Sequence, residues 1–276
     1  MPPFIEAHKL EYTYPLEGGE RILALRGIDL AIEQGEFVAL VGPNGSGKST
    51  LARHLNGLLL PTGGEVRVGG LLTSDSRHLW TVRQQVGMVF QNPDNQLVAS
   101  TVEEDVAFGP ENQALPPAEI RRRVDEALDV VGLSEYRTHP PQMLSGGQKQ
   151  LLAIAGALAS RPACIVFDEP TSMLDPPGRR RVLETIRRLN GEERLTVVLI
   201  TQSMDEAAAA RRVLVMHAGR IAMDGPPEEI FEQEEQLQAL GLDLPPVVEI
   251  AHRLRERGTP LPTGLLTVEA LARALC

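Results

Sequence analysis

A glycine-rich loop between a strand and a helix constrains this chain more than any other feature. Residues 36–41 form a short apolar run typical of a buried strand, and residues 48–57 have helical character. The intervening pattern G-x-x-x-x-G-K-S/T predicts a loop whose backbone N–H groups surround phosphate oxygens at a helix N-terminus. Lys48 is expected to reach the β and γ phosphates, and the Ser49 hydroxyl to ligate Mg²⁺. The predicted nucleotide-binding residues are Gly42, Pro43, Asn44, Gly45, Ser46, Gly47, Lys48, Ser49 and Thr50.

Composition narrows the class of protein further. The 276 residues are 42% hydrophobic, enough for a packed core, which excludes a disordered chain. The net charge of −10 argues against a nucleic-acid coat and an anionic-lipid clamp. The apolar runs fall short of the roughly 20 residues of a spanning helix, and residues 1–10 do not resemble a secretion signal. Two cysteines cannot make a disulfide framework, so we expect a soluble protein of a reducing compartment.

The order of patterns along the chain predicts an α/β core with additions. Strand patterns at 4–14 and 22–32 indicate an antiparallel unit, and later strands alternate with helices, which implies a mainly parallel sheet covered on both faces. We therefore predict a nucleotide-binding core at 1–91 and 159–225, a helical insert at 92–158, and a tail at 226–276 with three helices. The arginine triplets at 121–123 and 179–181 are expected to be solvated helix faces paired with glutamates.

Two carboxylates follow a buried strand at residues 164–167. In an open parallel sheet, ligands sit at the C-terminal ends of the strands. Asp168 is therefore predicted to hold the Mg²⁺ shell, and Glu169 to orient or deprotonate an attacking water. No protein-held metal is expected beyond the Mg²⁺ that arrives with ATP.

A second anion-binding surface is predicted about a hundred residues after the phosphate loop. The run Leu144-Ser145-Gly146-Gly147-Gln148 opens the second helix of the insert, and a serine with two glycines at a helix N-terminus favours anion binding. One explanation for two such surfaces in one chain is that each completes a site on another chain.

These motifs, in this order, resemble those of ABC-transporter ATPases, whose signature is identical to residues 144–148. The resemblance implies a P-loop NTPase (ABC ATPase) core with an antiparallel β subdomain, an α-helical signature subdomain and a small helical extension. It also implies an ATPase that meets a second ATPase head to tail, with Ser145, Gly146, Gly147 and Gln148 at the partner's nucleotide. Gln91 resembles the glutamine that senses Mg²⁺ and water, Asp175 belongs to a D-loop-like pair, and Tyr14 resembles the aromatic that stacks on adenine.

Three further stretches, at 91–96, 101–112 and 171–176, together with the tail, resemble the ATPases of energy-coupling-factor transporters. This resemblance implies an ATP-hydrolysing subunit of an importer for a metal ion or a vitamin, at the cytoplasmic face of the cell membrane. The implied cofactors are ATP and Mg²⁺. The implied partners are a second ABC ATPase, a transmembrane coupling subunit and small substrate-binding membrane proteins, with no nucleic acid. The transported substrate is not encoded in this chain.

Two positions depart from the family pattern. Gln202 replaces the usual histidine that contacts the γ-phosphate, and Leu151 replaces an arginine. Glutamine keeps an amide donor but cannot become cationic. We therefore hypothesise that this site turns over slowly and that its intact signature serves a more competent sibling ATPase, which makes a sibling partner favoured over self-pairing.

Three alternatives stay open at this point. The first is an ATPase of a conventional importer with a soluble binding protein, against which the tail and residues 92–96 speak. The second is a regulatory subunit that closes without hydrolysing, against which Glu169 weighs. The third is a soluble ATP-switched clamp of DNA repair or translation, for which the chain lacks both length and a basic surface.

Overall fold

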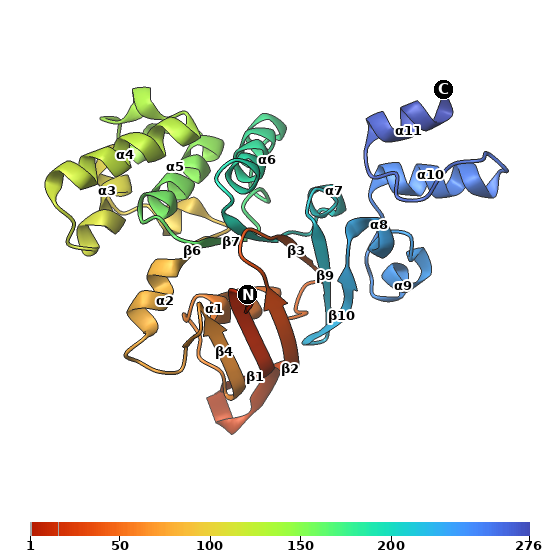
Figure 1. Ribbon diagram of the computed structural model, residues 1–276, viewed down its shortest axis with the longest axis horizontal. Coiled ribbons are helices and arrows are strands. Elements are labelled where there is room, and N and C mark those ends of the chain that lie inside the picture. The colour runs from red at the N-terminus through yellow and green to blue at the C-terminus, as the bar shows by residue number, and fades with distance from the viewer. Residues whose placement is uncertain (1, 16) are drawn as a thin grey trace.

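Two sheets lie at the centre of the computed structural model, which describes residues 2–15 and 17–276. One sheet has four strands in the order β2-β1-β4-β5, and the other has six in the order β10-β9-β3-β8-β7-β6. Figure 1 shows the helical insert at one end of the long axis, the C-terminal helices at the other, and the four-stranded sheet between them to one side.

The N-terminal sheet is antiparallel, as the sequence predicts. β1 pairs on one side with β2 and on the other with β4, so that Ile5 lies opposite both Ile32 and Val68. All three side chains are buried. The strands are β1 (Ile5–Pro15), β2 (Arg21–Ile32), β4 (Gly63–Val68) and β5 (Leu71–Leu72).

The larger sheet is mainly parallel. β3 pairs in parallel with β8 and β9, and β7 pairs in parallel with β6 and β8. Its strands are β3 (Phe37–Val41), β6 (Val86–Val89), β7 (Cys164–Asp168), β8 (Thr196–Ile200), β9 (Arg212–His217) and β10 (Arg220–Gly225). The sequence analysis did not predict β10, an antiparallel edge strand on which exposed and half-buried residues alternate.

Each face of this sheet is covered, which explains the apolar runs. Along β3, Ala39 and Val41 belong to one core with the helices α5 (Gly146–Ala159) and α6 (Pro176–Gly191). Val38 and Leu40 belong to a second core with α1 (Lys48–Leu55) and the antiparallel sheet. Because neighbouring residues of a strand point to opposite faces, a strand covered on both sides is apolar throughout.

The remaining helices of this region are α2 (Leu79–Gln85), α3 (Val102–Asn112), α4 (Pro117–Val131) and α7 (Met204–Ala207). Short 3₁₀ turns lie at Glu17–Gly19, Pro93–Asn95, Ser134–Tyr136 and Pro141–Met143. α3 starts with a capping box in which Thr101 accepts from the Glu104 N–H, and it packs with α4 and α5 to form the insert.

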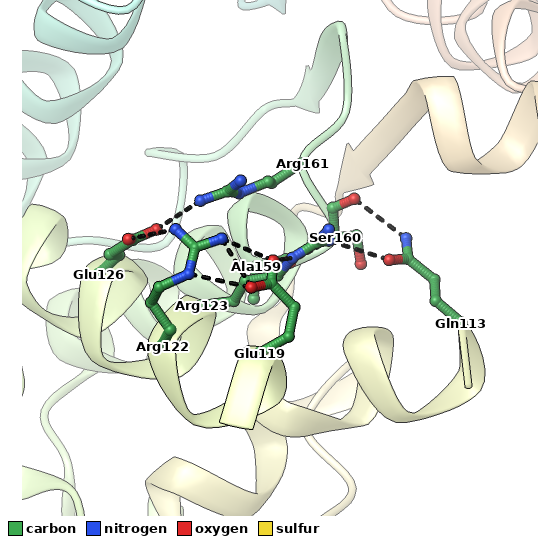
Figure 2. Close-up of polar contacts among 8 residues, drawn as sticks. All are labelled: Gln113, Glu119, Arg122, Arg123, Glu126, Ala159, Ser160 and Arg161. Carbon is green, nitrogen blue, oxygen red and sulfur yellow. Dashed lines mark hydrogen bonds and ion pairs between the residues drawn. The ribbon is translucent and has the colours of Figure 1, made fainter. Parts of the chain in front are cut away.

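The first arginine triplet forms ion pairs on the surface of the insert. Figure 2 shows Arg122 between Glu119 and Glu126, one turn away on either side along α4, and Arg161 on Glu126. Arg123 also contacts Glu119 and reaches Gln113 at the end of α3. The expected pairing with glutamates is confirmed for Arg122 and Arg123, and the described contacts include none for the Arg121 side chain. Surface pairs of this kind contribute only about 0–1 kcal/mol each.

The tail contains four helices, so the prediction of three is wrong. They are α8 (Pro227–Ile230), α9 (Glu234–Ala239), α10 (Pro246–Glu256) and α11 (Val268–Leu275). The first predicted helix is split because Gln233 adopts φ −93° and ψ 56°, which is not helical. α10 and α11 share a small core with Leu261 and Leu265. In the described parts of the chain, every helix is too short or too polar to cross a bilayer.

Candidate active site

The phosphate loop packs so closely against neighbouring backbone that only glycine fits at two of its positions. Gly42 has φ +151° and Gly47 has φ +105°, values that favour glycine. A Cβ atom on Gly42 would lie 2.2 Å from the carbonyl oxygen of Met216, and one on Gly47 would lie 2.9 Å from that of Ala24. Packing of β9 and β2 therefore fixes the shape of the loop at the start of α1.

Lys48 lies inside this loop. Its side chain is buried, and its Nζ donates to the carbonyl oxygens of Gly42 at 2.8 Å and Pro43 at 3.1 Å. Burial lowers the pKa of Lys48, while the charges of Glu169 and Asp168 act in the opposite direction. A phosphate in the loop would supply the anionic partner that two neutral carbonyls do not.

Ser49 and Asp168 come together across 119 residues of sequence, as the motif analysis predicts. Ser49 Oγ donates to Asp168 Oδ1 at 3.0 Å. Asp168 ends β7 and is buried, and this burial raises the pKa of its carboxyl group while the Ser49 hydrogen bond lowers it. A hydroxyl and a carboxylate oxygen beside a phosphate loop are the donor set that Mg²⁺ takes together with nucleotide phosphates.

Glu169 is held in a backbone conformation that is uncommon for a side-chain-bearing residue. Its φ is +50°, and its N–H donates to the Ile200 carbonyl at 3.0 Å. Such conformations cost about 1–3 kcal/mol and cluster at active sites. Its Oε1 accepts from Gln202 Nε2 at 2.8 Å, and the same amide donates to Asn44 Oδ1 at 3.1 Å. Gln202 therefore links the phosphate loop to Glu169.

A cleft of about 480 Å³ lies along the phosphate loop and is lined by Tyr14, Asn44, Lys48, Ser49 and Glu169 together with Ile22, Ala24 and Gly219. The Tyr14 hydroxyl contacts Thr50 Oγ1 at 3.2 Å, which places the aromatic ring beside the start of α1. The sequence analysis missed the lining residues of β2 and the β9–β10 turn because no local motif marks them.

Gln91 and Gln202 lie in an adjoining cleft. This cleft, of about 460 Å³, is lined by both glutamines and by Glu169. Gln91 follows β6, whose C-terminal end lies at the same edge of the sheet as Asp168. The predicted residues of the phosphate loop, the acidic pair Asp168 and Glu169, and the two glutamines thus gather in one region.

The signature lies elsewhere. Ser145 caps α5, with its Oγ accepting from the Gln148 N–H while Gln148 Oε1 accepts from the Ser145 N–H at 2.9 Å. A Cβ on Gly147 would lie 3.0 Å from the Cα of Gly178 in α6, and Asp175 caps that helix. Residues 145–148 line neither cleft described above. Within one chain, the two anion-binding surfaces are separate.

The two departures from the family pattern have different surroundings. Gln202 is exposed at the cleft, where its amide nitrogen donates to Glu169 and Asn44. Leu151 is 2% exposed and packs in the core shared by α5 and α6. Leucine at this position therefore contributes to packing, whereas Gln202 lies within the site.

Known proteins resemble this chain closely. The profile of the ABC transporter family matches residues 25–172. The energy-coupling factor transporter ATP-binding protein EcfA1 of Symbiobacterium thermophilum is 59% identical, covering 99% of this chain and 97% of its own length. The protein of the same name from Caldanaerobacter subterraneus is 53% identical over the whole of both chains.

Solved structures agree with this family. CbiO1 from Clostridium perfringens, part of the ABC transporter complex cbiONQ, superposes with a TM-score of 0.78 at 35% identity, covering 91% of this chain and 100% of its own. The ATP-binding cassette MJ0796, as a dimer bound to ADP and Pi, gives 0.73 at 33% identity, covering 81% of this chain and 98% of its own. The chain therefore belongs to the ABC transporter family, as an ATP-hydrolysing, ATP-binding protein of the energy-coupling-factor type.

Proposed function

We propose that this chain powers uptake of a metal ion or a vitamin by closing on a second ATPase, head to tail, when ATP binds. The observation that carries the proposal is the separation of two anion-binding surfaces. The phosphate loop has its Mg²⁺ and water-activating residues beside it, whereas residues 145–148 stand alone at the N-terminus of α5. Each surface would be completed by the opposite surface of the partner.

Within its own site, each residue takes a role that its position supports. Tyr14 stacks on adenine, the phosphate loop through Thr50 binds the phosphates, and Lys48 stabilises charge on the γ-phosphate. Ser49, Asp168 and Gln91 would hold Mg²⁺, which neutralises the charge that develops on the phosphate oxygens when it is bound.

Glu169 accepts a proton from the attacking water or orients it. The Gln202 amide nitrogen donates to Glu169 and Asn44, and it would redirect one of these two hydrogens to the γ-phosphate when ATP binds. Across the interface, Ser145, Gly146, Gly147 and Gln148 would face the γ-phosphate held by the partner, with Asp175 close to the shared interface. ATP therefore bridges the two chains, and its hydrolysis releases them.

Gln202 favours an asymmetric pair. Removing one transition-state donor costs about 10²–10³ in rate, and glutamine for histidine should cost less. We infer that this site turns over slowly beside a sibling ATPase with the more competent site. A regulatory chain that closes without hydrolysis would be the extreme of this asymmetry, and the placement of Glu169 in the cleft argues against it.

The proposed partners are a sibling ATPase, a transmembrane coupling subunit gripped at the cytoplasmic face of the membrane, and small substrate-binding membrane proteins. The naming of CbiO1 as part of cbiONQ and the dimer of MJ0796 support such an assembly. A conventional importer with a soluble binding protein is the competing assembly.

Affinity purification of this chain from native membranes in mild detergent distinguishes these assemblies. We expect a sibling ATPase, one shared integral subunit and one or more small membrane proteins to co-elute. A permease without small membrane proteins would support the conventional importer. A chain that is absent from membranes would contradict both.

A further inference from the structure

A buried carboxylate outside the motifs borders the cleft that holds Gln91 and Gln202. Glu206, on the short helix α7, is 2% exposed. Its Oε1 accepts from Thr171 Oγ1 at 2.6 Å and from Arg179 Nε at 2.7 Å, and its Oε2 accepts from Thr201 Oγ1 at 2.5 Å. Burial of a carboxylate costs several kcal/mol unless hydrogen bonds and a countercharge offset it, and here three donors do so.

Two of these donors flank catalytic side chains. Thr171 follows Glu169 by two residues. Thr201 directly precedes Gln202, and its Oγ1 also accepts from the Ser203 N–H at 3.0 Å. The Thr201 hydroxyl therefore connects the two residues on either side of Gln202. Glu206 therefore holds the backbone on which Glu169 and Gln202 are carried.

The third donor extends the network towards the signature. Arg179 lies on α6, the helix that Asp175 caps through the Gly178 N–H at 3.0 Å. Gly178 in turn is the close neighbour of Gly147. The expected pairing with a glutamate holds at Arg179, but that glutamate is buried and belongs to another helix.

We propose that Glu206 is a positioning residue for hydrolysis, which sets Glu169 and Gln202 relative to each other and ties both to the start of α6. Glu206 makes no hydrogen bond to the phosphate loop among the described contacts. Its loss should consequently slow the chemical step much more than it weakens ATP binding. A misplacement of about 1 Å at a reacting group can cost on the order of 10²-fold in rate.

The test measures ATP hydrolysis by Glu206→Gln in the assembled transporter, with the partner ATPase's own site inactivated by mutation, and binding of a fluorescent ATP analogue to the purified chain. The new amide would direct its NH₂ group at a threonine hydroxyl or at Arg179, where the carboxylate only accepts. We expect kcat to fall about 10-fold to 100-fold while the Kd for the nucleotide changes less than about twofold. Asp205→Asn is the matched control, because Asp205 is an exposed acidic residue on the same helix.

A second pair of variants separates positioning from folding. Thr171→Val removes one donor and keeps the side-chain volume, so it should give a smaller loss of kcat in the same direction. In a Glu169→Gln background, Glu206→Gln should cause little further loss, because both changes act on the same step. Wild-type turnover in Glu206→Gln and Thr171→Val would overturn the proposal, as would a loss of ATP affinity as large as the loss of rate.

Discussion

The phosphate loop and the signature are both helix N-termini that favour anions, yet they differ in how much of a site each contains. The phosphate loop is enclosed by β2 and β9, and it has a buried lysine and the Ser49–Asp168 pair beside it. The signature is an exposed capping box whose neighbours are Leu174 and Gly178. This difference supports the proposal that the first surface binds a nucleotide and that the second completes a nucleotide site formed by another chain.

Replacing Glu169 should have the largest effect on hydrolysis, since it removes the proposed general base and leaves the phosphate loop intact. We expect Glu169→Gln to lower hydrolysis at this chain's own site about 10²–10⁴-fold, the range of general acid–base catalysis, with ATP affinity retained. Phosphate release and nucleotide binding measure the two quantities, and light scattering should show an ATP-trapped closed dimer. Hydrolysis at the wild-type rate would mean that the assigned base is wrong.

The signature can be perturbed separately from the phosphate loop, through the contact of Gly147 with α6. Alanine is the better helix former, but a Cβ on Gly147 would lie 3.0 Å from Gly178 and force the two helices apart. We expect Gly147→Ala to slow hydrolysis in the assembled transporter about tenfold, with ATP binding by this chain unchanged. Gly156→Ala on the same helix is the control, because its Cβ would make an ordinary 3.8 Å contact with Asp105. Equal rates in the two variants would contradict the role of this contact.

The proposed asymmetry predicts a smaller change in the opposite direction. Gln202→His should raise the turnover of the assembled transporter several-fold, because a ring that can carry a positive charge would replace a neutral amide. Gln202→Ala should lower it by less than the 10²–10³ typical of a lost oxyanion donor. If Gln202→His leaves turnover unchanged, this position does not limit the rate.

The smallest predicted effect concerns Asp168 and the thermal stability of the chain in the absence of nucleotide. Burial raises the pKa of Asp168 above its ordinary value of 3.8, so the ionised form is disfavoured in the fold. Protonated Asp168 makes its full contribution to the free energy of unfolding below about pH 4, and this contribution is lost as the pH rises through the pKa of Asp168 in the folded state. At neutral pH, Asp168→Asn should therefore raise Tm by about 2–4 °C, and the gain should vanish in acid.

Thermal unfolding over a pH series measures this shift. Asp205→Asn serves as the control because Asp205 is exposed. A Tm for Asp168→Asn that is equal to or below that of the parent chain at neutral pH would contradict the cost of burying this carboxylate.

Local sequence patterns were sufficient to predict the motifs, but not the side-chain contacts that connect one motif to another. The strand–loop–helix around Lys48 and the acidic pair after β7 could be predicted because each is written in a few consecutive residues. The Gln202–Asn44 contact and the Glu206 network could not, because they join residues that are far apart in the sequence. In the tail, the break at Gln233 has no Gly or Pro to mark it, and the edge strand β10 lacks the apolar run of a covered strand.

Photocleavage by trapped vanadate tests the central claim most directly, because vanadate bound in place of the γ-phosphate cuts the backbone nearest to it. In the purified transporter with ATP and Mg²⁺, fragments of this chain are mapped by mass spectrometry after irradiation. The head-to-tail account predicts cuts both within residues 42–49 and within residues 145–148, the second set only when the partner ATPase is present. Cuts confined to residues 42–49 in the complete assembly would contradict it.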